Sequence, residues 1–261
     1  MSNIRYTLIL LLFVIFSFQN CGTVLLLNAL WPSSGDDLFE DIGKLYLGTI
    51  NVGLIHYWPL DGDANDKVGS IHLTAFGTVG PILTSDHNNL PNGAFRYDGI
   101  DSWHSSDSIA GEPILTGIAS FTLSAWVKGK FKPSGGGTIM GQGDGLGFQF
   151  LDDSTTCLHG LRIYTVSGGS GAVSNVSPCG IYQDNVWYHM TFTWDLPNNT
   201  ANLYVGNDLV KSTVYNPNGT PWNSGAPFTL GYGTLGGGAQ PINIDEVRIY
   251  NRVVPPIFFS F

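Results

Sequence analysis

The length, composition and charge of the chain narrow the possible classes of protein. Its 261 residues are enough for one large domain, and 34 glycines and 14 prolines with only 12% charged residues are typical of a turn-rich, all-β protein. Acidic residues outnumber basic ones by 20 to 11, the net charge is −9, and Lys and Arg form no cluster. A surface that neutralises phosphates is therefore missing, so we do not expect nucleic acid as a partner.

Residues 1–20 have the pattern of an export signal. Arg5 is followed by an almost unbroken apolar run from Tyr6 to Phe18, which is too short to cross ~30 Å of hydrocarbon at ~1.5 Å per residue. Cys21 comes directly after this segment and resembles the lipobox cysteine of bacterial lipoproteins, in the looser form that spirochaetes tolerate, because Asn20 replaces a small residue. We predict a signal peptide at 1–20 and lipidation at Cys21. An ordinary cleaved signal peptide and a retained membrane span are the alternatives.

Residues 21–52 show no strand alternation. They begin apolar, pass through a turn-rich stretch at 32–37 and continue with helical spacing of apolar residues over 38–46. We interpret 21–52 as a lipidated tether, with room for one short helix, that carries a domain at 53–261 away from the membrane. The predicted location is therefore the membrane surface, at the outer membrane or cell surface.

From residue 53 onward, strand patterns recur and turn residues separate them. The predicted strands lie at 54–60, 70–76, 94–99, 120–129, 138–143, 145–151, 160–166, 186–195, 200–212, 228–233 and 242–251. Because no long helical stretch intervenes, they predict an all-β sandwich or barrel. In 120–129 and 186–195 one face is apolar and the other polar or mixed, so one side of each strand should face the core.

Cys157 and Cys179 are the two cysteines that remain once Cys21 is assigned to lipid. They flank a strand-like stretch that enters a Gly/Ser-rich turn and returns, so the two side chains can meet across a hairpin. We predict a disulfide between them, in an oxidising compartment. A zinc site needs more Cys or His at close spacing than this segment offers.

Six sequence segments, taken in order, carry a family resemblance. They are YWPLDGDAND, FRYDGIDSW, SFTLSAWVKG, NVWYHMTFTWD, NLYVGNDLV and IDEVRIYN. Together they resemble the laminin-G-like, concanavalin A-like jelly roll, which implies an all-β, two-sheet antiparallel sandwich. The resemblance says little about function, because such domains include lectins, carbohydrate-binding modules, adhesion domains and glycosidases.

The sequence predicts no enzymatic activity. Glycosidases need two carboxylates across the sugar cleft, and those of the resembled fold usually carry them in a Glu-x-Asp-x-x-Glu run, which is absent here. The closest acidic pairs, Asp152–Asp153 and Asp245–Glu246, are adjacent residues, which should point to opposite faces of a strand. The six histidines fall in unrelated segments, and His189 is expected to be a hydrogen-bonded residue on the sheet surface.

Calcium is a candidate cofactor. The acidic segment 61–66 is not the helix–loop–helix calcium motif, because Asp66 stands where that motif has glycine and His72 where it has glutamate. The family resemblance implies a different calcium site, built from the loop after the first strand and the aspartate of the last strand. On that basis Asp61 and Asp245 are candidate metal ligands. The alternative is a solvated turn at Asp61 and a hydrogen-bonded strand end at Asp245.

Aromatic residues in polar, Gly-rich segments are candidates for ligand binding, because an exposed ring can stack on a sugar. Three residues share this setting: Trp103, Trp222 and Tyr232. The alternative for each is that it anchors its own loop. Four other tryptophans lie inside strand patterns and are expected mostly in the core: Trp58, Trp126, Trp187 and Trp194.

These observations predict a membrane-anchored surface lipoprotein that displays a non-catalytic binding module. The expected partners, besides the membrane, are glycans or host matrix proteins. Two alternatives stay open: a structural envelope lipoprotein without ligand recognition and, with less support, a glycoside hydrolase-like enzyme. The sequence alone does not name the ligand or the oligomeric state.

Overall fold

The structure is a computed structural model. It describes residues 50–106, 114–115, 118–130, 137–142, 146–153, 157–167, 171–214, 227–232 and 241–259, with the backbone alone at 151–153, 157–158, 164–167 and 171–176. The chain divides into two compact units, Met1–Val52 and Gly53–Phe261. Only residues 50–52 of the first unit are described, so the account below concerns the second. No helix in the described part of the chain is long and apolar enough to cross a membrane.

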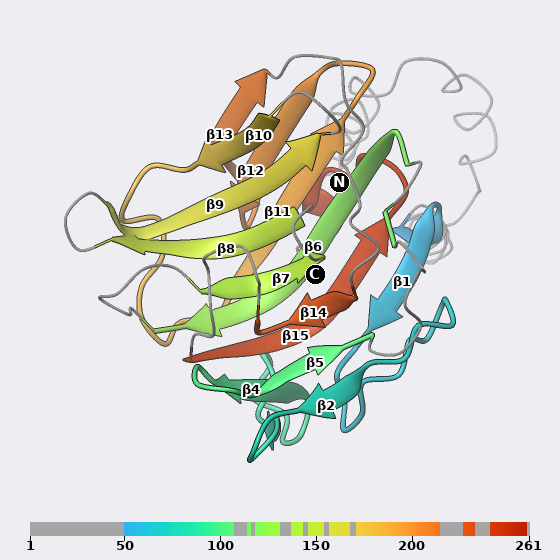
Figure 1. Cartoon of the computed structure of the whole chain (residues 1–261), viewed down its shortest axis with the longest axis vertical. Helices are drawn as coiled ribbons and strands as arrows, with labels where there is room; N and C mark the ends of the chain where they lie inside the picture. The colour runs from blue at the N-terminus through green and yellow to red at the C-terminus, as the bar shows by residue number, and fades with distance from the viewer. Residues whose placement is uncertain are drawn as a thin grey trace, which may run out of the picture. The chain divides into compact units, whose positions relative to one another are not determined.

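The second unit is built from two antiparallel sheets (Figure 1). Sheet A contains, in spatial order, β13 (Asp208–Val214), β12 (Thr200–Val205), β11 (Tyr188–Asp195), β6 (Ser120–Gly129), β15 (Pro241–Tyr250), β4 (Ala94–Asp98) and β3 (Ile82–Thr84), and β1 (Leu54–Trp58) pairs with β15. Sheet B contains β10 (Gly171–Val176), β9 (Cys157–Ser167), β8 (Leu146–Asp153), β7 (Thr138–Gln142), β14 (Phe228–Leu230), β5 (Trp103–Ser105) and β2 (Thr74–Phe76). A short 3₁₀ helix, η1 (Pro256–Phe259), follows β15. The all-β, two-sheet antiparallel jelly roll predicted from the sequence is confirmed.

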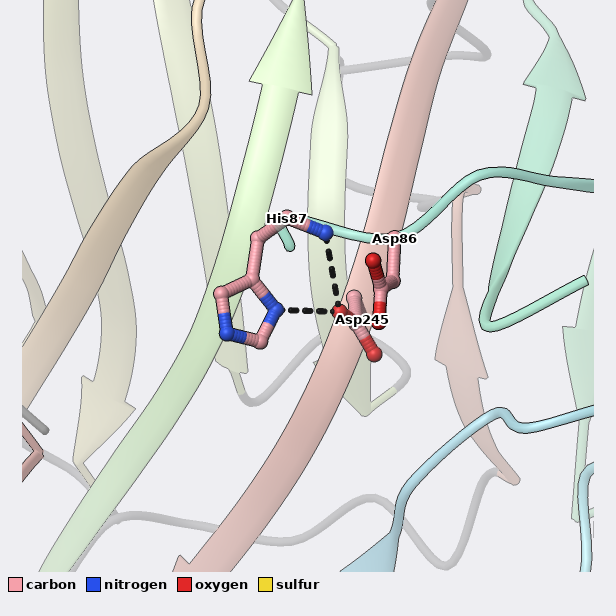
Figure 2. Close-up of side chains that lie close together, drawn as sticks. All are labelled: Asp86, His87 and Asp245. Carbon is pink, nitrogen blue, oxygen red and sulfur yellow. Dashed lines mark hydrogen bonds and ion pairs between the residues drawn. The ribbon is translucent and has the colours of Figure 1, made fainter. Parts of the chain in front are cut away.

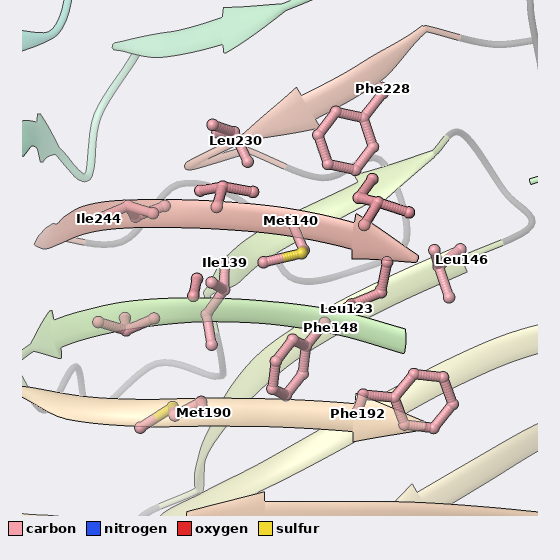
Figure 3. Packing of buried hydrophobic residues seen from close by; sticks show 14 of the residues in the cluster. Leu123, Ile139, Met140, Leu146, Phe148, Met190, Phe192, Phe228, Leu230 and Ile244 are labelled. Carbon is pink, nitrogen blue, oxygen red and sulfur yellow. The ribbon is translucent and has the colours of Figure 1, made fainter. Parts of the chain in front are cut away.

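The core lies between the sheets and follows from strand alternation. In β6 the side chains of Phe121, Leu123, Ala125 and Val127 are fully buried. Figure 3 shows side chains of both sheets meeting there, with Leu123 and Phe192 of sheet A close to Phe148 of sheet B. Each such large apolar side chain contributes about 1.5–3 kcal/mol through burial.

Two of the tryptophans expected in the core lie elsewhere. Trp58 and Trp194 are fully buried, whereas Trp126 and Trp187 are partly exposed. Trp126 alternates with the core residues of β6, so it projects from the outer face of sheet A. Lys128, on the same face, lies 4.9 Å from the centre of the Trp187 ring.

The predicted strand at 200–212 is wrong in one respect, because it is a hairpin. Residues 206–207 form the turn between β12 and β13, and Gly206 has a φ of 57°, which glycine adopts without strain. The strands β3, β5 and β10 are absent from the predicted set, although a chain return after the Gly/Ser-rich turn was expected where β10 lies. β3 and β5 have three residues each, which is too short for alternation to be recognised, and β10 has six residues rich in small and polar types.

The outer face of sheet A is partly covered by the segment 251–259. The hydroxyl of Thr122 on β6 donates a hydrogen bond to the carbonyl of Arg252 at 2.8 Å and accepts one from the N–H of Val254 at 2.9 Å. Phe259 of η1 stacks on His189 of β11, with ring centres 4.9 Å apart. Polar residues that alternate with the core residues of sheet A are therefore buried as well.

Candidate functional site

Three side chains gather on the outer face of sheet A: Asp86, His87 and Asp245 (Figure 2). Asp245 lies in β15, and the other two lie in the turn between β3 and β4. That turn is fixed by Asp86, whose Oδ1 accepts hydrogen bonds from the backbone N–H groups of Asn88 at 2.8 Å and Leu90 at 2.7 Å. A short aspartate side chain is well suited to this local bonding. The turn in this way holds His87 beside Asp245.

The histidine is positioned by four contacts. Its Nδ1 lies 2.6 Å from Oδ2 of Asp245, and its backbone N–H points to the same oxygen at 3.4 Å. Nδ2 of Asn88 lies 2.9 Å from Nε2 of His87. If this amide donates, Nε2 is the acceptor and Nδ1 carries the proton that bonds Asp245. The imidazole also stacks on Trp126, with ring centres 4.4 Å apart and planes 9° apart.

The carboxylates of this region influence one another. Burial raises the pKa of Asp245 to about 6, with a further contribution from the charge of Glu246, although the hydrogen bonds from His87 act in the opposite direction. The pKa of Asp61 is also raised, by burial first and then by the charges of Glu246 and Asp86. The outer face of sheet A around Asp245 is therefore an acidic region, and Asp61 belongs to its electrostatic surroundings.

A β-bulge interrupts the strand alternation at Asp245 and Glu246, on which the expectation of opposite faces was based. The pairing of β15 with β6 shifts register between Asp245 and Arg248, and Glu246 has a φ of 54°. Its carboxylate accepts hydrogen bonds from the hydroxyl of Tyr57 at 2.8 and 3.0 Å and pairs with Arg248. The extra residue of a bulge breaks simple alternation, so adjacent acidic residues can act on one another here.

The acidic loop 61–66 has a structural centre at Asp66. Its carboxylate lies 2.7 Å from Nδ1 of His56 and accepts backbone hydrogen bonds from Tyr57, Val68, Gly69 and Ile71. Burial by itself would raise the pKa of Asp66, but the hydrogen bonds from His56 and the backbone outweigh it and lower the pKa to about 2. This role of Asp66 could not be predicted from the sequence, because only the three-dimensional turn brings the donors together.

The donor set near Asp245 fits calcium poorly. Asp86, His87 and Asp245 each offer a ligand atom within 4.8 Å of the others, and Asp61 is not part of this group. Calcium takes six to eight oxygen ligands, whereas the nearest partner of the Asp245 carboxylate is a histidine nitrogen. Binding of Ca²⁺ by Asp61 and Asp245 stays a prediction.

Two of the three predicted ligand-binding aromatics come together on sheet B. The ring of Trp103 in β5 stacks on Tyr232, which follows β14, at 5.1 Å between centres, and on Phe76 of β2 at 5.5 Å. All three rings, called the aromatic ladder below, are partly exposed. Phe76 was missed because its position at the end of a predicted strand carries no signal of exposure. Trp222 lies outside the described residues.

His189 is a buried, neutral histidine. Its Nε2 lies 2.9 Å from Oγ of Ser124, and burial lowers its pKa to about 3. Ser124 is fully buried. This serine–histidine contact therefore presents no nucleophile to solvent. His189 is hydrogen-bonded as expected, but it is buried beneath Phe259 and does not lie on the surface.

The cysteine predictions fall largely on parts of the chain that are not described. Cys21 lies outside the described residues, as does the side chain of Cys157. Cys179 is exposed and disulfide-bonded. Its pairing with Cys157 stays a prediction.

Several solved structures with a similar fold are toxin binding domains. The binding domain of botulinum neurotoxin DC in complex with SialylT matches with a TM-score of 0.60 and 14% identity over 81% of this chain and 51% of that chain. The receptor binding domain of the botulinum neurotoxin C/D mosaic serotype gives 0.61 and 13% over 80% and 50%, and the binding domain of Paraclostridial Mosquitocidal Protein 1 gives 0.61 and 14% over 80% and 51%. The chain thus spans about half the length of these structures, and at this identity the likeness shows the fold alone.

A family assignment comes from the sequence comparison. No curated protein matches the chain. Residues 104–256 match the family model Laminin_G_3, described as the concanavalin A-like lectin/glucanases superfamily. The matched segment is more than half of the chain and includes β6 to β15, the strands that build most of both sheets. The chain therefore belongs to the concanavalin A-like lectin/glucanase superfamily.

Proposed function

We propose that this chain is a non-catalytic binding module that recognises glycans through the aromatic ladder of Phe76, Trp103 and Tyr232. The observation that carries the proposal is the convergence of these three partly exposed rings from three different strands or strand ends. Rings of this kind usually lie in a core, so an exposed group of them indicates a surface used for binding.

The geometry of the ladder suits the apolar face of a sugar ring. Flat rings in full overlap would have centres at their contact distance of about 3.5–4.0 Å. Centres 5.1 Å apart with planes at 30°, and 5.5 Å apart with planes at 11°, mean that the rings are tilted or laterally offset. Offset stacking leaves part of each ring face uncovered. The C–H groups of a pyranose can pack on these electron-rich faces while its hydroxyls contact polar neighbours.

The titles of three similar structures describe those proteins bound to, or interacting with, a ligand, which supports a binding role for the present chain. One title describes the neurotoxin domain with SialylT, one describes interaction with two ganglioside molecules, and one describes a complex with rat synaptotagmin II. Proteins that contain this fold in about half of their chain therefore include ones with glycan ligands and one with a protein ligand. The aromatic ladder favours the glycan class for the present chain.

An immobilised array of glycans and matrix proteins, probed with the full chain, tests this function. We expect binding to a restricted set of glycans, and we expect Trp103→Ala to lose most of the signal. Trp187→Ala is the matched control, because Trp187 is another partly exposed tryptophan and contacts Lys128, outside the ladder.

Two outcomes would contradict the proposal. Equal glycan binding by Trp103→Ala and by the unaltered chain would show that the aromatic ladder is not the glycan-binding surface. A flat response to glycans and matrix proteins alike would favour the structural envelope role that the sequence left open.

We also propose that the module is displayed at a membrane surface by a lipid on Cys21. The apolar run before Cys21 and the resemblance to a lipobox support this anchor. Acyl chains contribute ~0.8 kcal/mol per buried CH₂ to membrane binding, so Cys21→Ala should move the protein from the membrane fraction to the soluble one. Unchanged partitioning, with no mass difference between the two proteins beyond the substitution, would oppose lipidation.

A further inference from the structure

The structure contains two histidine–aspartate pairs of the same geometry but with different surroundings. His56 and His87 each place Nδ1 against Oδ2 of a buried aspartate, at 2.7 Å from Asp66 and 2.6 Å from Asp245. Asp66 receives four backbone N–H groups in addition to its histidine. Both bonds to Asp245 come from His87 and both go to Oδ2. Asp66 is thus saturated with donors, whereas Asp245 is not.

The free oxygen of Asp245 is the feature that points to a ligand. Asp245 is 1% exposed, and among the described residues its Oδ1 has no hydrogen-bond donor. This oxygen is not one of the fully buried polar atoms without a partner in the described structure, so water or a cation can reach it, and a carboxylate oxygen in this position is a potential metal ligand.

A second buried carboxylate lies beside the first. Asp86 is 6% exposed and uses Oδ1 for its turn, so within the described structure its Oδ2 has no donor either. Figure 2 shows the carboxylates of Asp86 and Asp245 close together next to the His87 ring. Two buried acids and an imidazole therefore converge, with ligand atoms within 4.8 Å of one another.

We propose that Asp86, His87 and Asp245 bind a divalent transition-metal ion of the zinc type. One imidazole nitrogen and two carboxylate oxygens are ligands that zinc accepts, and three protein ligands leave one position for water. Calcium, the ion that the fold family implies, prefers a shell of oxygen atoms alone. The nitrogen of His87 therefore decides the class of metal.

The ion replaces the proton that His87 shares with Asp245. Nδ1 becomes the ligand and the imidazole proton moves to Nε2, so the ring stays neutral. Nε2–H then donates to the Asn88 side chain, whose amide turns to present its oxygen, as outer partners of ligating histidines commonly do. Ligand atoms on a tetrahedral zinc lie about 3.3 Å apart, so the imidazole moves slightly away from Asp245. The His87 side chain is 15% exposed, which gives the ion access from solvent.

The bound ion joins the β3–β4 turn to β15. His87 also covers Trp126, so a fixed imidazole would order this part of the outer face of sheet A. An ion that binds only the folded state raises stability in proportion to the logarithm of its concentration. The site would therefore be structural, and its loading is measured by stability as well as by binding.

Titration of the metal-free full chain with Zn²⁺, Ca²⁺ and Co²⁺ tests this proposal. We expect one high-affinity Zn²⁺ site by calorimetry, a melting temperature that rises by several degrees with Zn²⁺, and no comparable response to Ca²⁺. Co²⁺ should give the visible spectrum of nitrogen and oxygen ligands without a thiolate charge-transfer band, which separates this site from the cysteines. His87→Gln and Asp86→Asn should each weaken Zn²⁺ binding at least tenfold.

The matched control is His56→Gln, which alters the saturated pair and should leave Zn²⁺ affinity unchanged. Circular dichroism of each variant establishes that it is folded. Zn²⁺ binding that is unaffected by His87→Gln would overturn the proposal. So would Ca²⁺ binding that persists in this variant, because that result would restore the oxygen-only site.

Discussion

The indole ring of Trp103 lies 5.1 Å from the ring of Tyr232, and the strand order explains this contact. β5 lies between β14 and β2 in sheet B, so residues at the ends of these three strands meet side by side. Trp103 is opposite Phe76 in the pairing of β5 with β2. Three residues that are far apart in the sequence therefore form one partly exposed surface.

We expect the outer members of this ladder to contribute to binding through their ring faces. Tyr232→Ala should weaken glycan binding by about 2- to 10-fold, because an aromatic stacking contact contributes about 0.5–1.5 kcal/mol. Tyr232→Phe keeps the ring and should retain most of the affinity. Calorimetric titration with a glycan identified on the array measures the affinity of both variants. An equal loss of affinity in Tyr232→Ala and Tyr232→Phe would show that the hydroxyl, and not the ring, makes the contact.

The hydroxyl of Thr122 should stabilise the segment 251–259. Thr122→Val keeps the shape of the side chain but removes the hydrogen bonds to the Arg252 carbonyl and from the Val254 N–H. Leaving these backbone groups without partners should lower the free energy of unfolding by about 1–3 kcal/mol. Urea unfolding measures the loss, and Thr122→Ser, which keeps the hydroxyl, should be closer to the unaltered chain.

Reduction should destabilise the domain if Cys157 pairs with Cys179. Such a bond closes a loop of about 22 residues, which corresponds to roughly 3 kcal/mol from loop entropy. The melting temperature of the reduced and alkylated protein should fall accordingly. Peptide mapping without reduction identifies the pairing directly, and a disulfide that joins Cys179 to any other cysteine would make this prediction wrong.

The parts of the fold that the sequence predicted are those encoded by local pattern. The alternation in 120–129 and 186–195 identified β6 and β11 because one face of each strand is buried on the core. The Trp103–Tyr232 contact could be predicted only as two separate candidates, since strand order, which brings them together, is set by long-range pairing. His87 was missed as a site residue because its role depends on a turn between two short strands. The bulge at Glu246 was likewise invisible, because a positive φ at a glutamate leaves no mark in the sequence.

Asp66 should make the stability of the domain depend on pH in acid. Its pKa is lowered from 3.8 to about 2 in the folded state, so the folded protein binds a proton less readily than the unfolded chain. The carboxylate therefore stabilises the fold fully above about pH 4, and this contribution is lost as the pH falls towards 2. A pKa difference of this size corresponds to roughly 2 kcal/mol in the free energy of unfolding.

The variant Asp66→Asn isolates this contribution. It should unfold at lower urea concentration than the unaltered chain at pH 6, and the two proteins should become equally stable near pH 2. The control is Asp63→Asn in the same loop, whose exposed ion pair with Lys67 should change stability by less than about 1 kcal/mol. If the unfolding curves of Asp66→Asn and the unaltered chain stay separated by a constant amount down to pH 2, charge is not the source of the stabilisation. The hydrogen bonds that Asp66 accepts would then stabilise the turn equally well with a neutral side chain as with a charged one.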